Sequence, residues 1–149
     1  MCSWSIVCEG GPLDPITLST KPIPILIVDD FPPFRTGLRE LLQRFPHFIV
    51  VGEAGDGRAA IELTLSLAPQ VVIMDVNMPR VGGVEATLCI KQMLPEVHVI
   101  GLSLNDHVFT QDAMQAAGSS AFLSKGCTHQ LPRLIGMITG TWVTKEEFS

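Results

Sequence analysis

The stretch ILIVDD, residues 25–30, is an unbroken aliphatic run that ends in two aspartates. A second stretch, VVIMD at residues 71–75, has the same character and ends in a third aspartate. Aliphatic runs of this length, without polar alternation, are typical of strands that are buried on both faces of a parallel sheet. If the two strands are neighbours, three carboxylates converge beyond the carboxyl ends of backbones that lie about 4.8 Å apart.

These three carboxylates point to a metal site. Asp29, Asp30 and Asp75 would raise one another's pKa unless a cation lay between them. A cluster of oxygen ligands suits a hard divalent ion, and Mg²⁺ above all. Asp75 is also a candidate nucleophile, because aspartate forms acyl phosphates in phosphoryl-transfer proteins. The sequence therefore predicts a Mg²⁺ site with phosphoryl chemistry at this edge of the sheet.

The apolar pattern predicts five repeats of a strand followed by a helix. The expected strands cover residues 25–29, 48–52, 71–75, 97–102 and 121–124. Such repeats imply an α/β fold with a single doubly wound, five-stranded parallel sheet and helices on both faces. Periodicity alone does not fix the strand order. The flavodoxin-like order 2-1-3-4-5 is favoured because it places the two strands that end in aspartates side by side.

The expected helices follow from apolar spacing. Phe34, Leu38 and Leu42 recur at helical intervals after the first strand. In the fourth helix, one apolar stripe is expected to consist of Phe109, Ala113, Ala116 and Ala117, and the helix is expected to stop at Gly118.

Length and composition bound the organisation of the chain. A chain of 149 residues with 46% hydrophobic and 17% charged residues is expected to form one globular domain. We assign residues 1–23 to a flexible leader or linker, 24–140 to the domain, and 141–149 to a tail too short for an output domain. The net charge of −5 argues against nucleic-acid binding by this chain alone. No apolar run approaches the ~18–20 residues of a membrane span.

The four cysteines, Cys2, Cys8, Cys89 and Cys127, form no C-x-x-C pair and no zinc spacing with histidines. A domain with so large a core does not need a disulfide framework. We therefore expect free thiols in a reducing cytoplasm.

Two further polar residues follow predicted strands. Ser103 follows the fourth strand and Lys125 the fifth, so both would point into the same crevice as the aspartates. Lys125 offers a point charge to a phosphate oxygen, and the Ser103 hydroxyl can donate a hydrogen bond to another. Taken singly, such residues are more often helix caps, turn formers or surface residues. Their occurrence at the ends of four strands favours the functional interpretation.

Together these motifs resemble the receiver domain of two-component response regulators. The resemblance covers about residues 24–139 and rests on Val28-Asp29-Asp30, Asp75-Val76-Asn77-Met78-Pro79 with Gly83, Ser103, and Phe122-Leu123-Ser124-Lys125. The stretch VGEAGDG, residues 51–57, is most similar to receivers joined to a LuxR/FixJ-type DNA-binding domain.

The resemblance implies a role for each acidic residue. Asp75 resembles the aspartate that accepts a phosphoryl group from a sensor histidine kinase or a phosphotransfer protein. Asp30 and the backbone carbonyl of Asn77 resemble direct Mg²⁺ ligands beside Asp75. Asp29 resembles the acid that reaches the ion mainly through water.

The resemblance also implies a switch. Ser103 and Phe122 resemble the hydroxyl and the aromatic ring that respond to phosphorylation, and Lys125 resembles the lysine that pairs with the phosphoryl group. The protein would assist its own phosphorylation and dephosphorylation without being an enzyme in the turnover sense. Output would pass to a downstream protein target or to a homodimer, with no DNA binding by this chain alone and no membrane contact.

Other functions stay open at this point. A Mg²⁺-dependent phosphoaspartate-type hydrolase usually has a second aspartate two residues after the nucleophile, where this chain has Asn77. A flavodoxin-like cofactor module would need a phosphate loop where Phe31-Pro32-Pro33 stands. A degenerate receiver is disfavoured by the complete acid set. The chain could equally be a stand-alone receiver or a module of a hybrid kinase or of a DNA-binding regulator.

Overall fold

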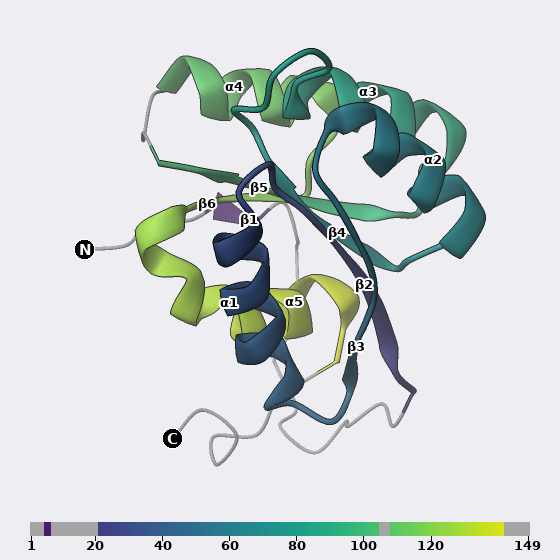
Figure 1. Ribbon diagram of the computed structural model, residues 1–149, viewed down its shortest axis with the longest axis vertical. Coiled ribbons are helices and arrows are strands. Elements are labelled where there is room, and N and C mark those ends of the chain that lie inside the picture. Colours follow the sequence, from purple (N-terminus) through teal and green to yellow (C-terminus); the bar gives the residue numbers. More distant parts are fainter. Residues whose placement is uncertain (1–4, 7–20, 105–107, 142–149) are drawn as a thin grey trace.

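The computed structural model describes residues 5–6, 21–104 and 108–141. In this part of the chain, one sheet lies between two layers of helices (Figure 1). Its strands are β1 (Ser5–Ile6), β2 (Ile23–Val28), β3 (Phe48–Ala54), β4 (Val71–Asp75), β5 (His98–Ser103) and β6 (Ala121–Ser124). They lie in the order β1-β6-β5-β4-β2-β3.

The strands β2 to β6 are parallel, and their spatial order confirms the predicted 2-1-3-4-5 topology. The short strand β1 was not predicted. It pairs antiparallel with β6 at the edge of the sheet, with Ser5 opposite Phe122. The assignment of residues 1–23 to a leader therefore needs correction, because Ser5–Ile6 join the sheet and Ile23 already belongs to β2. The rest of the predicted leader and most of the predicted tail lie outside the described residues.

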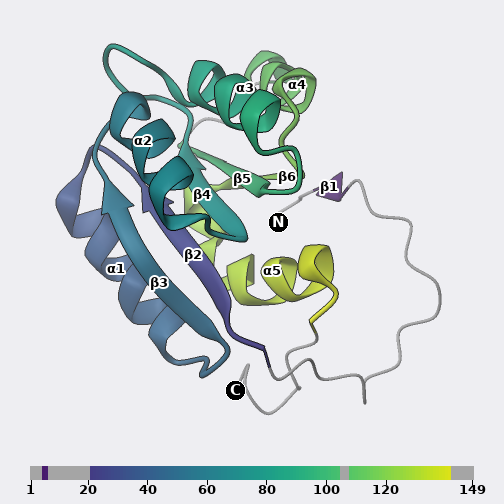
Figure 2. The same ribbon diagram turned by 90° about the vertical axis from the view of Figure 1, so that its right-hand side faces the viewer.

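Helices cover both faces of the sheet. They are α1 (Pro32–Gln43), α2 (Gly57–Leu67), α3 (Gly83–Met93), α4 (Val108–Ala117) and α5 (Leu131–Thr139), with a 3₁₀ helix, η1 (Lys125–Gln130), before α5. Helices α1 and α5 lie on one face, and α2, α3 and α4 lie on the other (Figures 1 and 2).

The core consists of one apolar cluster on each face of the sheet. Along β2, Ile25 and Ile27 belong to the cluster under α1 and α5, and Leu26 and Val28 to the cluster under α2, α3 and α4. Side chains alternate between the faces of a strand, so a strand covered on both sides has to be apolar at every position. This is the physical reason for the unbroken run that ends at Asp29.

The predicted stripe on α4 was wrong for Phe109. Its side chain is 88% exposed, whereas Met114 and Ala117 are the buried residues of this helix. Phe109 precedes Met114 by five positions, which places the two side chains about 140° apart around the helix. Met114 packs over Gly101 of β5 and thereby sets the buried face of α4.

The expectation of four free thiols was also wrong. Cys89 is free, but Cys127 is disulfide-bonded, and its partner lies outside the described residues. Sequence spacing does not show which thiols meet in space, and Cys2 and Cys8 are not described. In the part of the chain that the structure describes, no helix combines the length and apolarity needed to cross a bilayer.

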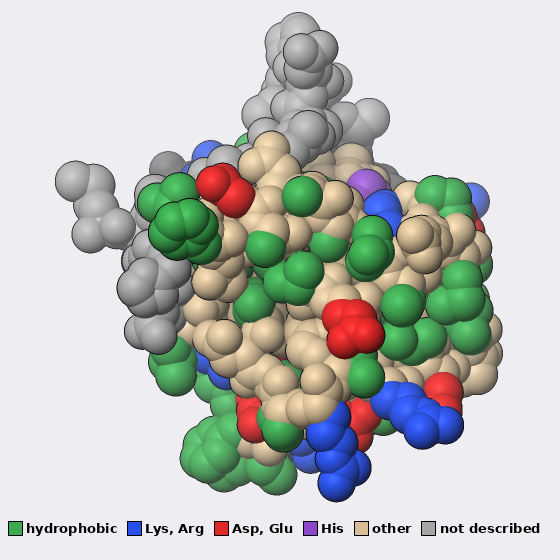
Figure 3. Space-filling model, turned by 90° about the horizontal axis from the view of Figure 1, so that it is seen from above, with side chains coloured by type: hydrophobic (Ala, Val, Ile, Leu, Met, Phe, Trp, Pro, Cys, Tyr) green, Lys and Arg blue, Asp and Glu red, His purple; other side chains and the backbone are tan. Residues whose placement is uncertain are grey.

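Figure 3 views the molecule over α2, α3 and α4. Hydrophobic side chains are scattered across this face in small groups, and the described Lys and Arg side chains at its lower edge lie beside acidic ones. This face of the described residues therefore presents mixed charges.

Candidate functional site

The three predicted aspartates meet at the carboxyl ends of two neighbouring strands. Val28 of β2 pairs with Met74 of β4, so the residues that follow, Asp29 and Asp75, lie side by side. One carboxylate oxygen from each of Asp29, Asp30 and Asp75 lies within 4.8 Å of the others. Asp29 and Asp75 are buried, and Asp30 is exposed. The structure therefore brings together the acids that the sequence pattern had placed in one crevice.

Lys125 joins this cluster from the first residue of η1. Its Nζ atom lies 2.6 Å from Asp29 Oδ2 and 3.4 Å from Asp75 Oδ2. The same nitrogen lies 4.6 Å from the centre of the Phe34 ring, at a distance typical of a cation–π contact. The side chain of Lys125 is only 10% exposed, so water screens these interactions weakly.

The protonation of Asp75 reflects this crowding. Burial is the main reason that the pKa of Asp75 rises from 3.8 to about 6, and repulsion by Asp29 is the second. Lys125 and the backbone N–H of Asn77 act in the opposite direction, and that N–H donates to Asp75 Oδ1 over 3.1 Å. A site in which burial and a second carboxylate outweigh an ammonium group favours an added cation.

The predicted switch residues lie at the ends of β5 and β6. Ser103 ends β5 and is fully buried, and the side-chain amide of Asn77 donates to its Oγ atom over 3.4 Å. Phe122 is buried in β6, where its ring packs with Met114 over Gly101. Ser103 thus reaches the acidic cluster through Asn77, while Phe122 belongs to the core under α4. Their roles in switching stay a prediction.

A cavity of about 440 Å³ opens onto the cluster. Its lining combines four polar residues, Asp30, Asp75, Asn77 and Lys125, with three apolar ones, Phe31, Phe34 and Leu104. The apolar residues were not among the predicted site residues. In the sequence, Phe31 directly follows Asp30 and Leu104 directly follows Ser103, and this was the available signal. Phe34 lies next to Lys125 only in the fold.

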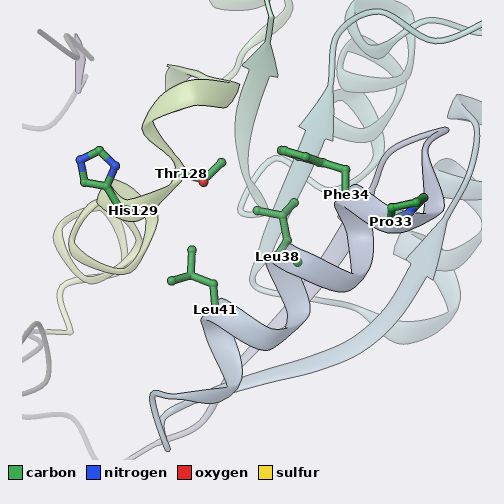
Figure 4. A pocket seen from close by; sticks show the side chains of 7 residues that line it. Pro33, Phe34, Leu38, Leu41, Thr128 and His129 are labelled. Carbon is green, nitrogen blue, oxygen red and sulfur yellow. The ribbon is translucent and has the colours of Figure 1, made fainter.

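Phe34 also lines a second cavity of about 310 Å³ between α1 and η1. Figure 4 shows this cavity, with Phe34 and Leu38 projecting from α1 and with Thr128 and His129 on the opposite side. Phe34 therefore separates the acidic site from an apolar recess on the α1 face.

The carboxylates differ in how much of their bonding capacity is already used. Asp29 Oδ1 accepts from the Phe31 N–H over 2.8 Å, and Asp29 Oδ2 pairs with Lys125. Asp30 has no hydrogen-bond or ion-pair partner within the described part of the chain. Asp30 and Asp75 line the cavity, and Asp29 does not. Two carboxylates that line a cavity of this size suit Mg²⁺, which takes few protein ligands and keeps several waters.

Comparisons with known proteins agree with this geometry. Residues 25–138 match the response regulator receiver domain family. The chain is 41% identical over 103 residues to the transcriptional regulatory protein DegU of Brevibacillus brevis, covering 69% of this chain and 44% of DegU. The chain therefore spans less than half of the length of DegU.

Two solved structures have the same fold. One is a two-component response regulator of the LuxR family from Aurantimonas sp. SI85-9A1, at 28% identity and a TM-score of 0.75, covering 85% of this chain and 93% of the other. The second is the isolated REC domain of RcsB from Salmonella enterica serovar Typhimurium, in the presence of phosphomimetic BeF₃⁻. It is 26% identical, with a TM-score of 0.73, and the match covers 86% of this chain and 96% of that domain.

Proposed function

The chain belongs to the response regulator receiver domain family, and we propose that it is the phosphoacceptor switch of a two-component phosphorelay, with Asp75 as the acceptor. The observation that supports this most directly is the position of Asp75. It ends the central strand β4, lines an open cavity, and has the Lys125 ammonium group 3.4 Å from its carboxylate.

In the proposed reaction, a carboxylate oxygen of Asp75 attacks the phosphorus of a phosphohistidine on a sensor kinase or phosphotransfer protein. The phosphorus–nitrogen bond breaks, and the histidine nitrogen keeps the electron pair and takes up a proton. Asp75 has to be ionised to attack, and with a pKa of about 6 it is mostly ionised at neutral pH. Lys125 then pairs with a phosphoryl oxygen, and the Ser103 hydroxyl donates to another.

Asp30, Asp75 and the Asn77 carbonyl would hold Mg²⁺, with Asp29 contributing through water. A Mg²⁺ ion held by these residues would supply positive charge to offset that of the phosphoryl oxygens. The residues present suit this role, because Asp30 has no partner of its own among the described residues and both cavity-lining acids offer oxygen ligands.

The signal would leave by protein contacts near α4, β6 and α5, the elements next to Ser103 and Phe122, towards a downstream protein or a second copy of the chain. This is a two-state equilibrium that a covalent charge biases. A cytoplasmic location is supported by the family match and not by the thiols, since Cys127 is disulfide-bonded. The chain would act as a phosphoacceptor rather than as an enzyme with turnover. Because it spans under half of DegU, it could serve as one module of a longer DNA-binding regulator.

The test is labelling by a small acyl phosphate in the presence of Mg²⁺, followed by intact-protein mass spectrometry. The wild type should gain one phosphoryl group and Asp75→Asn none. Asp56→Asn is the matched control, because Asp56 caps α2, belongs neither to the acidic cluster nor to the cavity lining, and asparagine caps equally well. Equal labelling of Asp75→Asn, or no labelling of the wild type, would contradict the proposal. Continuous release of phosphate from the acyl phosphate would instead favour a hydrolase.

A further inference from the structure

We propose that Arg35 is a positioning residue for the metal-binding loop. Its guanidinium group, held by Glu53, fixes the peptide between Asp29 and Asp30 and so directs the Asp30 carboxylate into the cavity. This inference rests on the proposed function, because it assumes that Asp30 is a ligand of Mg²⁺. It adds a residue of α1 that does not line the cavity to the determinants of the site.

The contacts of Arg35 join three elements. From α1, its Nη1 atom donates to the backbone carbonyl of Asp29 over 2.5 Å, just after β2. Its Nε atom donates to Glu53 Oε1 of β3 over 3.2 Å. Arg39, one helical turn further along α1, pairs with the other carboxylate oxygen of Glu53. Glu53 therefore orients Arg35 and balances its charge.

With the bond from Arg35 to the Asp29 carbonyl, every polar group of Asp29 has a partner. The Asp29 N–H donates to the Ala54 carbonyl over 3.0 Å, and both carboxylate oxygens of Asp29 have partners. The Asp29 carbonyl lies in the same planar peptide unit as the Asp30 N–H. The orientation of this peptide sets where the side chain of Asp30 starts from the backbone, and so limits the region that its carboxylate can reach.

The ion pair between Arg35 and Glu53 keeps the positive charge of Arg35 from acting on the metal site. An unpaired guanidinium group beside the acidic loop would repel a divalent cation, whereas Glu53 neutralises it while leaving its donors in place. The two side chains are 20% and 25% exposed, and ion pairs that reach water contribute little to stability. The contact should therefore matter more for binding Mg²⁺ than for folding.

The decisive measurement is the Kd for Mg²⁺, obtained by following backbone amide shifts during a Mg²⁺ titration of the whole chain. Arg35→Met removes the donors and keeps an apolar stem, and it should raise the Kd about 10-fold, as expected for a residue that orients a metal ligand. Arg39→Met is the matched control. It removes the other contact to Glu53 without touching Asp29, so the Kd should change less than about 2-fold.

A Kd for Arg35→Met within about 2-fold of the wild type would overturn the inference, and so would equal weakening by Arg39→Met. If Arg35→Met does not fold, Arg35→Lys serves instead. A lysine has one nitrogen in place of the two, Nε and Nη1, that Arg35 uses, so it should not reproduce both contacts in full. The Kd of Arg35→Lys should therefore be higher than that of the wild type. An unchanged Kd for Arg35→Lys would then contradict the inference.

The two proposals fail in different ways. A wild type that binds Mg²⁺ but is not labelled by an acyl phosphate overturns the phosphoacceptor function and leaves the role of Arg35 standing on its own titration. A wild type that binds no Mg²⁺ overturns both.

Discussion

Replacing Asp75 by asparagine is expected to stabilise the protein at neutral pH when divalent cations are removed. Burial and the neighbouring Asp29 raise the pKa of Asp75 from 3.8 to about 6. One pKa unit corresponds to about 1.4 kcal/mol, so ionisation of Asp75 lowers the free energy of unfolding by about 3 kcal/mol. Asparagine has nearly the shape of the protonated acid and carries no charge, so it avoids this loss.

The sign follows from the order of the two pKa values. The folded-state pKa of Asp75 is the higher one, so the wild type has no penalty below pH 3.8 and the full penalty above about pH 6. The difference in unfolding free energy between Asp75→Asn and the wild type should therefore grow by about 2.4 kcal/mol from about pH 4 to about pH 7. Titrating groups that do not interact with Asp75 are common to both proteins and cancel in the difference, whereas Asp29 and Lys125 interact with the Asp75 charge in the wild type alone.

Urea unfolding in EDTA across this pH range provides the assay. Glu62→Gln is a suitable control, because Glu62 forms an exposed pair with Arg58 and its loss should change stability by less than about 0.5 kcal/mol. Mg²⁺ at ten times its Kd should restore about 1.4 kcal/mol to the wild type and less to Asp75→Asn. A difference that stays flat or falls as pH rises would refute the reasoning, because Lys125 would then outweigh burial.

Four further outcomes can be checked on the same protein. Gly83→Ala should destabilise it by about 3 kcal/mol in urea unfolding, because a Cβ there would overlap the backbone of Asp75. Gly37→Ala, in an open part of α1, should instead stabilise it by about 0.5–1 kcal/mol. A double-mutant cycle of Phe34→Leu with Lys125→Met should give a coupling free energy of about 0.5–1 kcal/mol, and no coupling would exclude the cation–π contact. Lys125→Ala should fold, yet a phosphate mimic on Asp75 should no longer change amide hydrogen exchange in α4, where an undiminished change would contradict its role.

The parts of the fold that sequence could predict are those in which one physical requirement dominates. Strands buried on both faces have to be apolar throughout, so the runs before Asp29 and Asp75 could be placed directly. The aspartates at their ends then favoured the strand order, because a shared site needs neighbouring strands. Lys125 and Ser103 followed from the same rule.

Other features depend on relations that spacing does not encode. The bond from Arg35 to the Asp29 carbonyl requires the relative placement of α1, β2 and β3, and a lysine or arginine in a first helical turn is ordinarily a surface residue. Phe109 fits an apolar stripe on α4 equally well by sequence, and only the packing of Met114 over Gly101 decides between the two faces. The disulfide of Cys127 likewise depends on proximity in the fold.

The charges around Asp75 lower the stability of the folded protein, and they also bear on how the proposed switch would respond to phosphorylation. Three carboxylates face one ammonium group, and Lys125 Nζ lies closer to Asp29, at 2.6 Å, than to Asp75, at 3.4 Å. A phosphoryl group on Asp75 would add negative charge on that side, so we expect Lys125 to shift away from Asp29 towards Asp75. Because Lys125 is the first residue of η1, this shift acts on the backbone that joins β6 to α5. Burial and repulsion by Asp29, which raise the pKa of Asp75, would therefore favour a bound divalent cation, and the added phosphoryl charge would draw the lysine towards Asp75.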